Sequence, residues 1–197
     1  GDPRLPKYFA PISDGTYVGG EIGTPSSYSS YSHVSDRVKA ATEPGIILDY
    51  SEVEFLLAEA RARTFAVGGT AKEHYDTAIE ASFEFWGLSS SDAISYLLLP
   101  DVDYNTQIGL STASTPWKEV IGKQKYLALF NRGMEAWTSI RLLDFPAMAT
   151  PTEAVSGFPN RYTYPVVEQT LNSANYQAAS TAIGGDVTET KLFWDKF

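Results

Sequence analysis

Two helix signals follow one another directly between residues 51 and 87, with only the pair Gly68-Gly69 to separate them. At the start of the first, Ser51 and Glu54 have the spacing of a capping box, in which a hydroxyl and a carboxylate bond free N–H groups of the first turn. An apolar stripe at helical spacing follows and is formed by Val53, Leu56, Leu57 and Ala60. We therefore predict a helix over residues 51–65.

The second helix is marked at both ends. Thr70 and Glu73 repeat the capping-box spacing, and Gly87 is the residue type that commonly ends a helix. Between these ends an apolar face is formed by Tyr75, Ala78, Ile79, Ser82, Phe83 and Trp86. Because the linker is so short, the two segments predict a helical hairpin.

Further helix starts occur downstream. Three serines and an aspartate at residues 89–92 begin a short helix that ends before Pro100. The dipeptide Thr115-Pro116 has the residue types of a cap and a first helical position, and it begins a helix that reaches Phe130.

A tight break at residues 131–133 separates this helix from an antiparallel partner over residues 134–143, and residues 173–183 predict a last short helix. Two helical pairs with short linkers favour stacked hairpins. No segment alternates convincingly as a strand does, although residues 161–164 are compatible with one short extended piece.

The predicted fold is therefore all-α, with helical hairpins, long irregular loops, and little or no sheet. A chain of 197 residues has room for one ordinary domain. Within this single domain we expect a loop-rich segment at residues 1–45, helical hairpins at residues 46–143, and loops with a short terminal helix at residues 144–197.

Composition excludes several classes of function. The formal net charge is −9 and no run of Lys and Arg occurs, which argues against a nucleic-acid partner. Cysteine is absent, so thiol catalysis, thiolate metal sites and disulfides are excluded. No apolar run approaches the ~20 residues that span a bilayer as a helix.

Sites for catalysis or metal binding are weakly supported. His33 and Asp36 lie in a serine-rich loop where a Ser/His/Asp arrangement is conceivable, but no nucleophile-elbow motif accompanies them. Residues 101–105 match the first half of a calcium loop, yet Thr106 replaces the glycine that its sharp turn needs. Acidic residues on the predicted helices favour a solvated face over the paired carboxylates of a glycosidase: Glu52, Glu54, Glu59, Glu80 and Glu84. We expect no catalytic residue, no metal and no cofactor.

Exposed aromatic residues are the better candidates for a binding site. Tyr17, Tyr28 and Tyr31 lie in a glycine- and serine-rich loop, from which their rings can be presented outward. An aromatic face packs against sugar C–H groups while polar side chains bond the hydroxyls, so this loop suits a glycan. The alternative is that the tyrosines only pin the loop to the helices.

Four groups of motifs, in this order along the chain, carry a resemblance to a known family. The first is DPRLPKYF at residues 2–9 followed by GTYVG at 15–19, and the second is the helix YSEVEFLLAEA at 50–60. The third joins YDTAIEAS at 75–82 and WG at 86–87 to QKYLALF at 124–130 and EAW at 135–137. The fourth comprises YP at 164–165, EQ at 168–169, LN at 171–172 and FWDK at 193–196.

Together these motifs resemble the carboxy-terminal region of the SusD/RagB-type outer-membrane lipoproteins of Bacteroidetes. The resemblance implies a SusD-like fold of tetratricopeptide-like hairpins without enzymatic activity. It also implies capture of an oligosaccharide or peptide nutrient at the cell surface, beside a SusC-like TonB-dependent transporter of the outer membrane. The chain would then be a carboxy-terminal fragment, with the lipid anchor outside it.

Two other classes stay open at this point. One is a helical-repeat scaffold that binds a protein partner through its hairpin groove, and the other is a glycoside hydrolase fragment. Ligand residues vary in the SusD-like family, so no motif assigns one here. The three tyrosines are candidates from their residue type and loop setting alone.

Overall fold

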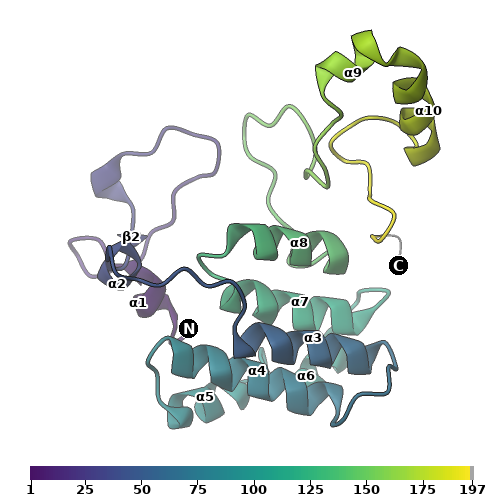
Figure 1. The fold of residues 1–197 in the computed structure, drawn as a ribbon. Coiled ribbons are helices and arrows are strands. Elements are labelled where there is room, and N and C mark those ends of the chain that lie inside the picture. The colour runs from purple at the N-terminus through teal and green to yellow at the C-terminus, as the bar shows by residue number, and fades with distance from the viewer. Residues whose placement is uncertain (196–197) are drawn as a thin grey trace. The chain divides into compact units, whose positions relative to one another are not determined.

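The computed structural model describes residues 1–195 and is mainly helical (Figure 1). Its contacts divide the chain into two units, one of residues 1–20 with 26–147 and one of residues 21–25 with the chain from 148 onwards. The prediction of an all-α fold is confirmed, because the described part has one sheet of two short strands beside its helices. Lys196, the last residue of the fourth motif, lies outside the described residues.

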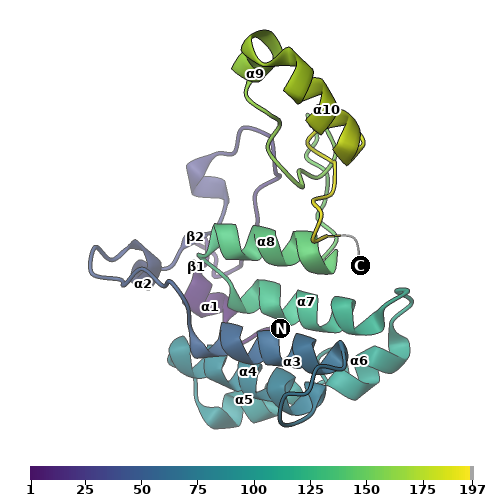
Figure 2. The same cartoon turned by 45° about the vertical axis from the view of Figure 1, so that its right-hand side comes forward.

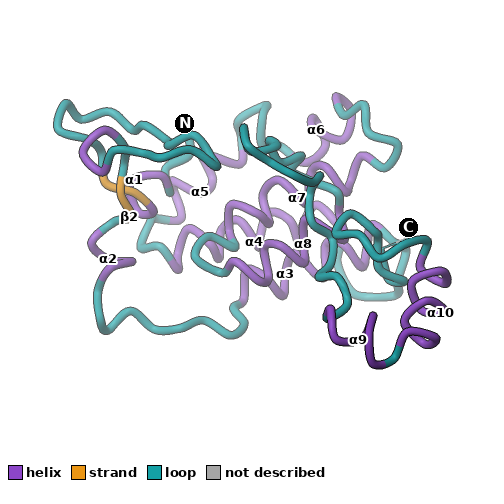
Figure 3. Tube along the Cα trace, turned by 90° about the horizontal axis from the view of Figure 1, so that it is seen from above, coloured by secondary structure: helices purple, strands orange, loops and turns teal. Residues whose placement is uncertain are grey.

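The secondary-structure elements fall as follows. The first unit contains α1 (Leu5–Tyr8), β1 (Phe9–Ala10), the 3-10 helix η1 (Tyr28–Ser30), β2 (His33–Val34), α2 (Asp36–Lys39), α3 (Tyr50–Ala62), α4 (Ala71–Phe85), α5 (Ser90–Leu97), α6 (Tyr104–Leu110), α7 (Pro116–Ala128) and α8 (Gly133–Leu143). The second unit contains α9 (Val166–Leu171) and α10 (Ser173–Ile183). Figure 3 shows the helices in purple and the long loops in teal.

Helices α3, α4, α7 and α8 form the frame of the first unit. α3 packs against α4 and α7, and α7 packs against α8, so the frame is built of helical hairpins laid side by side (Figures 1 and 2). α5 and α6 pack against α4. Buried apolar side chains from these helices form one core, which includes Phe55, Ala58, Tyr75, Ala78, Ile79, Phe83, Ala93, Tyr96, Val120, Ile121 and Leu143.

Helix α4 confirms its prediction at both ends. The Thr70 hydroxyl accepts a hydrogen bond from the Glu73 N–H at 3.1 Å, and the Glu73 carboxylate accepts one from the Thr70 N–H at 2.7 Å. The positive φ of 72° at Gly87 follows the last turn. Each residue of the predicted apolar face is buried: Tyr75, Ala78, Ile79, Ser82, Phe83 and Trp86.

Helix α3 forms where it was expected, but its cap and its buried face were predicted wrongly. Asp49, not Ser51, caps it, since the Asp49 carboxylate accepts from the Glu52 N–H at 2.8 Å. Ser51 instead donates to the Ala78 carbonyl of α4 at 2.7 Å. The residues buried along α3 are Ser51, Glu54, Phe55, Ala58 and Glu59, whereas Leu56 is 44% exposed. Contacts with α4 and α7, on two sides of α3, determine this face.

Several short elements were not predicted. Residues 1–45, expected to be loop-rich, contain β1 and β2 together with the short helices α1, η1 and α2, and α9 lies in the other segment that was expected to be loop. α6 was also missed: it begins where the Asp103 carboxylate accepts from the Thr106 N–H at 2.9 Å. The described chain has no strand at residues 161–164, whereas α10 has the predicted bounds.

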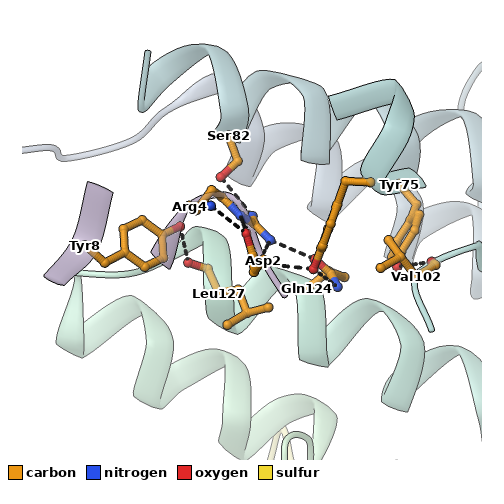
Figure 4. Close-up of polar contacts among 9 residues, drawn as sticks. Asp2, Arg4, Tyr8, Tyr75, Ser82, Val102, Gln124 and Leu127 are labelled. Atoms are coloured by element: carbon orange, nitrogen blue, oxygen red, sulfur yellow. Dashed lines mark hydrogen bonds and ion pairs between the residues drawn. The ribbon is translucent and has the colours of Figure 1, made fainter. Parts of the chain in front are cut away.

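A buried arginine fixes the start of the first unit to its helices. The Arg4 side chain is inaccessible to solvent and forms an ion pair of 2.7 Å with Asp2. It also donates to Ser82 of α4 at 3.1 Å and to Gln124 of α7 at 3.0 Å (Figure 4). Tyr8 adds a bond of 2.9 Å from its hydroxyl to the Leu127 carbonyl. Residues 2–8 therefore lie across the α4 and α7 helices.

The second unit has its own polar centre. Arg161 pairs with Asp186 at 2.6 Å, and the Tyr164 N–H donates to the same carboxylate oxygen at 3.1 Å. The backbone N–H groups of Asn160 and Arg161 both donate to the Thr188 carbonyl. These bonds tie the loop before α9 to the segment after α10.

None of the helices within residues 1–195 combines the length and the apolar character that crossing a membrane requires.

Candidate functional site

The three candidate tyrosines lie in an excursion of the chain between β1 and β2. The strands pair antiparallel, with Phe9 opposite Val34 and Ala10 opposite His33. The Ser35 N–H continues the pairing by donating to the Tyr8 carbonyl at 2.8 Å. We call residues 11–20 and 26–32 the tyrosine loop; the residues between its two arms belong to the second unit.

A second pair of hydrogen bonds closes the tyrosine loop further out. The Val18 N–H donates to the Ser32 hydroxyl at 2.9 Å, and the Ser32 N–H donates to the Val18 carbonyl at 2.8 Å. Tyr17 precedes one of these bonded residues and Tyr31 precedes the other, one on each arm. The arms are thus held together by one backbone–backbone bond and one backbone–side-chain bond rather than left as a free coil.

The side chains of the three tyrosines differ in exposure. Tyr28 is 78% exposed and Tyr17 is 37% exposed, whereas Tyr31 is half-buried. The ring of Tyr31 lies against Gly20, where an added Cβ would come within 3.8 Å of Tyr31 Cδ1 and 3.1 Å of the Ser26 hydroxyl. Tyr31 therefore helps to pack the two arms together, while Tyr28 points a ring toward solvent.

The ring contact of Tyr28 is with His33. The two rings stack with centroids 3.7 Å apart and planes 24° from parallel. His33 Nε2 also lies 2.5 Å from the Tyr28 carbonyl oxygen, so both the ring and the backbone of Tyr28 contact this histidine. Sequence reasoning selected Tyr28 for binding but weighed His33 only as a catalytic residue, and missed this contact.

Charged groups lie beside this ring pair. Ser35 caps α2, within which Lys39 and Asp36 form an ion pair of 2.7 Å. The hydrogen bond to Asp36 raises the pKa of Lys39 against the opposing effect of burial, and the nearby Tyr28 also contributes. With Asp36 paired to Lys39 and His33 bonded to Tyr28, the conceivable Ser/His/Asp arrangement is not formed. The site instead combines an aromatic surface with polar groups, which suits binding rather than proton transfer.

Three of the five carboxylates considered for glycoside hydrolysis form ion pairs, whereas Glu80 and Glu84 lie exposed on α4. Glu52 pairs with Arg132 at 3.0 Å, Glu54 with His74 at 2.6 Å, and Glu59 with Arg63 at 2.8 Å. The expectation that they form a solvated face was wrong for two of them, since Glu54 and Glu59 are buried. Their partners explain how these charges are tolerated in the interior.

No calcium loop is formed at residues 101–105. Asp103 instead caps α6, accepting bonds from both the N–H and the hydroxyl of Thr106. Within residues 1–195 no group of three or more His, Asp and Glu side chains is placed to hold a metal ion.

Comparison with known proteins decides the family. A SusD-like family model, described as starch-binding and associating with the outer membrane, matches residues 1–165. This chain belongs to the SusD-like family. Among curated proteins none matches it.

Solved SusD-like structures share the fold along the whole chain. A SusD homologue from Bacteroides vulgatus superposes with a TM-score of 0.78 at 25% identity, over 99% of this chain and 46% of its own. One from Bacteroides thetaiotaomicron gives 0.75 at 28% identity, over 100% of this chain and 49% of its own. This SusD-like chain thus spans less than half the length of these relatives.

Chitin is named as a ligand among the relatives of known structure. A chitin-binding SusD homologue from Flavobacterium johnsoniae gives a TM-score of 0.76 at 26% identity, over 98% of this chain and 46% of its own. SusD-like homologues are binding proteins and not enzymes, in agreement with the expectation of no reactive centre.

Proposed function

We propose that this chain is part of a cell-surface, lipid-anchored protein that binds an oligosaccharide without hydrolysing it. In this proposal it acts with a SusC-like TonB-dependent transporter that carries the bound sugar across the outer membrane. The family match over residues 1–165 is the observation that carries the proposal, and the chitin-binding relative supports the ligand class.

The tyrosine loop is the proposed place of binding. Tyr28 offers the open face of an aromatic ring, Tyr17 is partly exposed nearby in sequence, and Tyr31 holds the arms of the loop together. Sugar rings pack their C–H faces on aromatic rings, and hydroxyls bond neighbouring polar groups. Lys39 and Asp36 beside Tyr28 are groups of that kind.

Calorimetric titration with two probes, chitohexaose and maltohexaose, tests this site. We expect at least one of them to bind, and Tyr28→Ala to weaken its affinity by roughly threefold to tenfold, because an aromatic contact is worth about 0.5–1.5 kcal/mol beyond the area it buries. Tyr17→Ala and Tyr31→Ala are expected to weaken it as well. Tyr162, which is 79% exposed in the second unit, supplies the matched control, and Tyr162→Ala should leave affinity unchanged.

The opposite outcomes have distinct meanings. If a sugar binds and none of the three tyrosine substitutions weakens its affinity, the sugar does not bind at the tyrosine loop. Failure of both probes to bind would contradict an oligosaccharide ligand of either type. The proposed ligand would then be a peptide nutrient.

The lipid anchor, the transporter and the single-domain organisation are parts of the same proposal. We infer that the chain is the carboxy-terminal part of a longer protein, which its span of under half of its structural relatives supports. The exposed apolar side chains of Ile47 and Leu48, ahead of α3, are also consistent with cover from further chain.

Purification of the native protein from detergent-solubilised outer membranes should recover a longer lipidated polypeptide together with the transporter. A soluble, unlipidated 197-residue protein without that partner would contradict this part.

A further inference from the structure

The stack of Tyr28 on His33 has one fixed member and one exposed member. His33 belongs to β2, where it pairs with Ala10 of β1, so the backbone that carries its imidazole is held by the sheet. Tyr28 belongs to η1, a single 3-10 turn that has no side-chain cap and no buried residue. Its ring would otherwise be free to change rotamer.

His33 restrains that ring by two separate contacts. The imidazole covers one face of the phenol ring at a centroid distance of 3.7 Å, and its Nε2 reaches the carbonyl oxygen of the same residue. With 78% of Tyr28 still exposed, the ring remains accessible to a ligand. A ring that is already held in one orientation loses less conformational entropy when a ligand packs on it.

We propose that His33 is a positioning residue: it holds Tyr28 in the orientation that receives a sugar ring, without touching the sugar itself. This inference rests on the proposed function of the tyrosine loop. It adds a role for a residue that no motif identifies.

The proposal predicts how affinity responds to substitution. Ordering one side chain on binding costs about 0.5–1.5 kcal/mol, so His33→Ala should weaken binding of the sugar by roughly threefold to tenfold. His33→Phe keeps a stacking ring but loses the bond to the Tyr28 carbonyl, and it should restore part of the affinity. The other histidine of the chain, His74, pairs with Glu54 far along the sequence, and His74→Ala is the matched control with unchanged affinity.

A double-mutant cycle separates positioning from direct contact. Calorimetry is carried out on the wild type, His33→Ala, Tyr28→Ala and the double variant, with whichever of chitohexaose and maltohexaose binds more tightly. If His33 acts only through Tyr28, the double variant binds as weakly as Tyr28→Ala alone. Losses that add would show that His33 contacts the sugar, and an unchanged affinity of His33→Ala would show that it has no role; both overturn the proposal.

A measurement without ligand checks the stack itself. In NMR spectra of protein with labelled tyrosine rings, His33→Ala should shift the Tyr28 ring signals downfield and His33→Phe should not, because only the alanine variant lacks a neighbouring ring. Unshifted Tyr28 signals in His33→Ala would overturn the stack.

If neither sugar binds to the wild type, the proposed function fails, and the positioning role fails with it even where the stack is seen. If the wild type binds and Tyr28→Ala weakens binding while His33→Ala does not, only the positioning role fails.

Discussion

At the scale of single residues, charged side chains in the interior hold distant parts of the first unit together. Arg4 has its guanidinium shared among Asp2, Ser82 and Gln124, so one side chain joins the start of the chain to α4 and α7. Burial works to raise the pKa of Asp2, but the bonds and charge of Arg4 outweigh it and lower that pKa below its usual value. No pattern in the sequence could reveal this cluster of polar side chains, because Arg4 and Gln124 are 120 positions apart.

Replacing this arginine should cost much of the stability of the first unit. We expect Arg4→Ala to lower the free energy of unfolding by about 3–5 kcal/mol, as removal of one partner leaves buried polar groups unsatisfied. Lys123 is the control, because it pairs with Glu119 at 2.6 Å while 47% of its side chain stays exposed. Lys123→Ala should cost less than about 1 kcal/mol in the same urea titrations. Equal losses for both variants would contradict the role given to Arg4.

The pair of His74 and Glu54 predicts a dependence of stability on pH. The hydrogen bond to Glu54, followed by that to the Gly68 carbonyl, raises the pKa of His74, and burial opposes both. A raised pKa in the folded state means that protonated His74 is favoured by folding. Its contribution is therefore complete below the unfolded pKa of about 6.5 and is lost as the pH rises through the higher folded value.

Urea unfolding of wild type and His74→Gln at a series of pH values from 5.5 to about 9 measures this effect, since that range spans the titration of a histidine with a raised pKa. The stability difference between the two proteins should be largest at the acidic end and shrink as the pH rises. A difference that stays constant, or that grows toward alkaline pH, would contradict the assigned ion pair.

At the scale of elements, local sequence signals predicted helices well where the cap residues serve only their own helix. Thr70 forms the capping box that its spacing predicts, and Ser89 caps the helix that was expected to begin at residues 89–92. At α3 the same spacing failed, because Ser51 bonds the Ala78 carbonyl and Glu54 bonds His74, both on α4. Both side chains bond residues of a neighbouring helix instead of their own first turn. The spacing of residues along one helix cannot predict such contacts between helices.

Two threonines at helix starts differ in whether their side chain caps the helix, and the effect of this difference on stability can be measured. Thr70 caps α4 with its hydroxyl, whereas Thr115 occupies the cap position of α7 without a side-chain bond. Thr70→Ala should lower the free energy of unfolding by about 1 kcal/mol, and Thr115→Ala by only a few tenths. Chemical denaturation followed by circular dichroism compares them, and a larger loss for Thr115→Ala would contradict the assigned caps.

Two glycines inside helices should respond in opposite directions to alanine. A Cβ on Gly122 of α7 would come within 2.9 Å of the Phe145 carbonyl oxygen, while one on Gly109 of α6 would meet nothing within 4 Å. Gly122→Ala should therefore destabilise the protein by about 1–3 kcal/mol, and Gly109→Ala should stabilise it by up to about 1 kcal/mol. The two midpoints of thermal unfolding should lie on either side of the wild-type value. A Gly122→Ala variant as stable as the wild type would show that α7 and residue 145 are not in close contact.

At the scale of the whole molecule, the sequence identified the loop that carries the candidate site but not how the loop is built. Tyr17, Tyr28 and Tyr31 were selected because glycine- and serine-rich surroundings favour exposure, and Tyr28 is indeed the most exposed of the three. The pairing of Val18 with Ser32 and of Tyr28 with His33 depends on the register of two strands only two residues long. Strands that short leave no periodic signal.

We propose that this helical frame holds a loop that binds an oligosaccharide and releases it intact. Incubation of the protein with chitohexaose and maltohexaose, followed by calorimetry and by chromatography of the recovered sugar, measures both halves of that claim at once. We predict saturable binding of at least one hexasaccharide and its full recovery at six residues in length. Shortened sugars among the products, or the absence of binding to both, would contradict it.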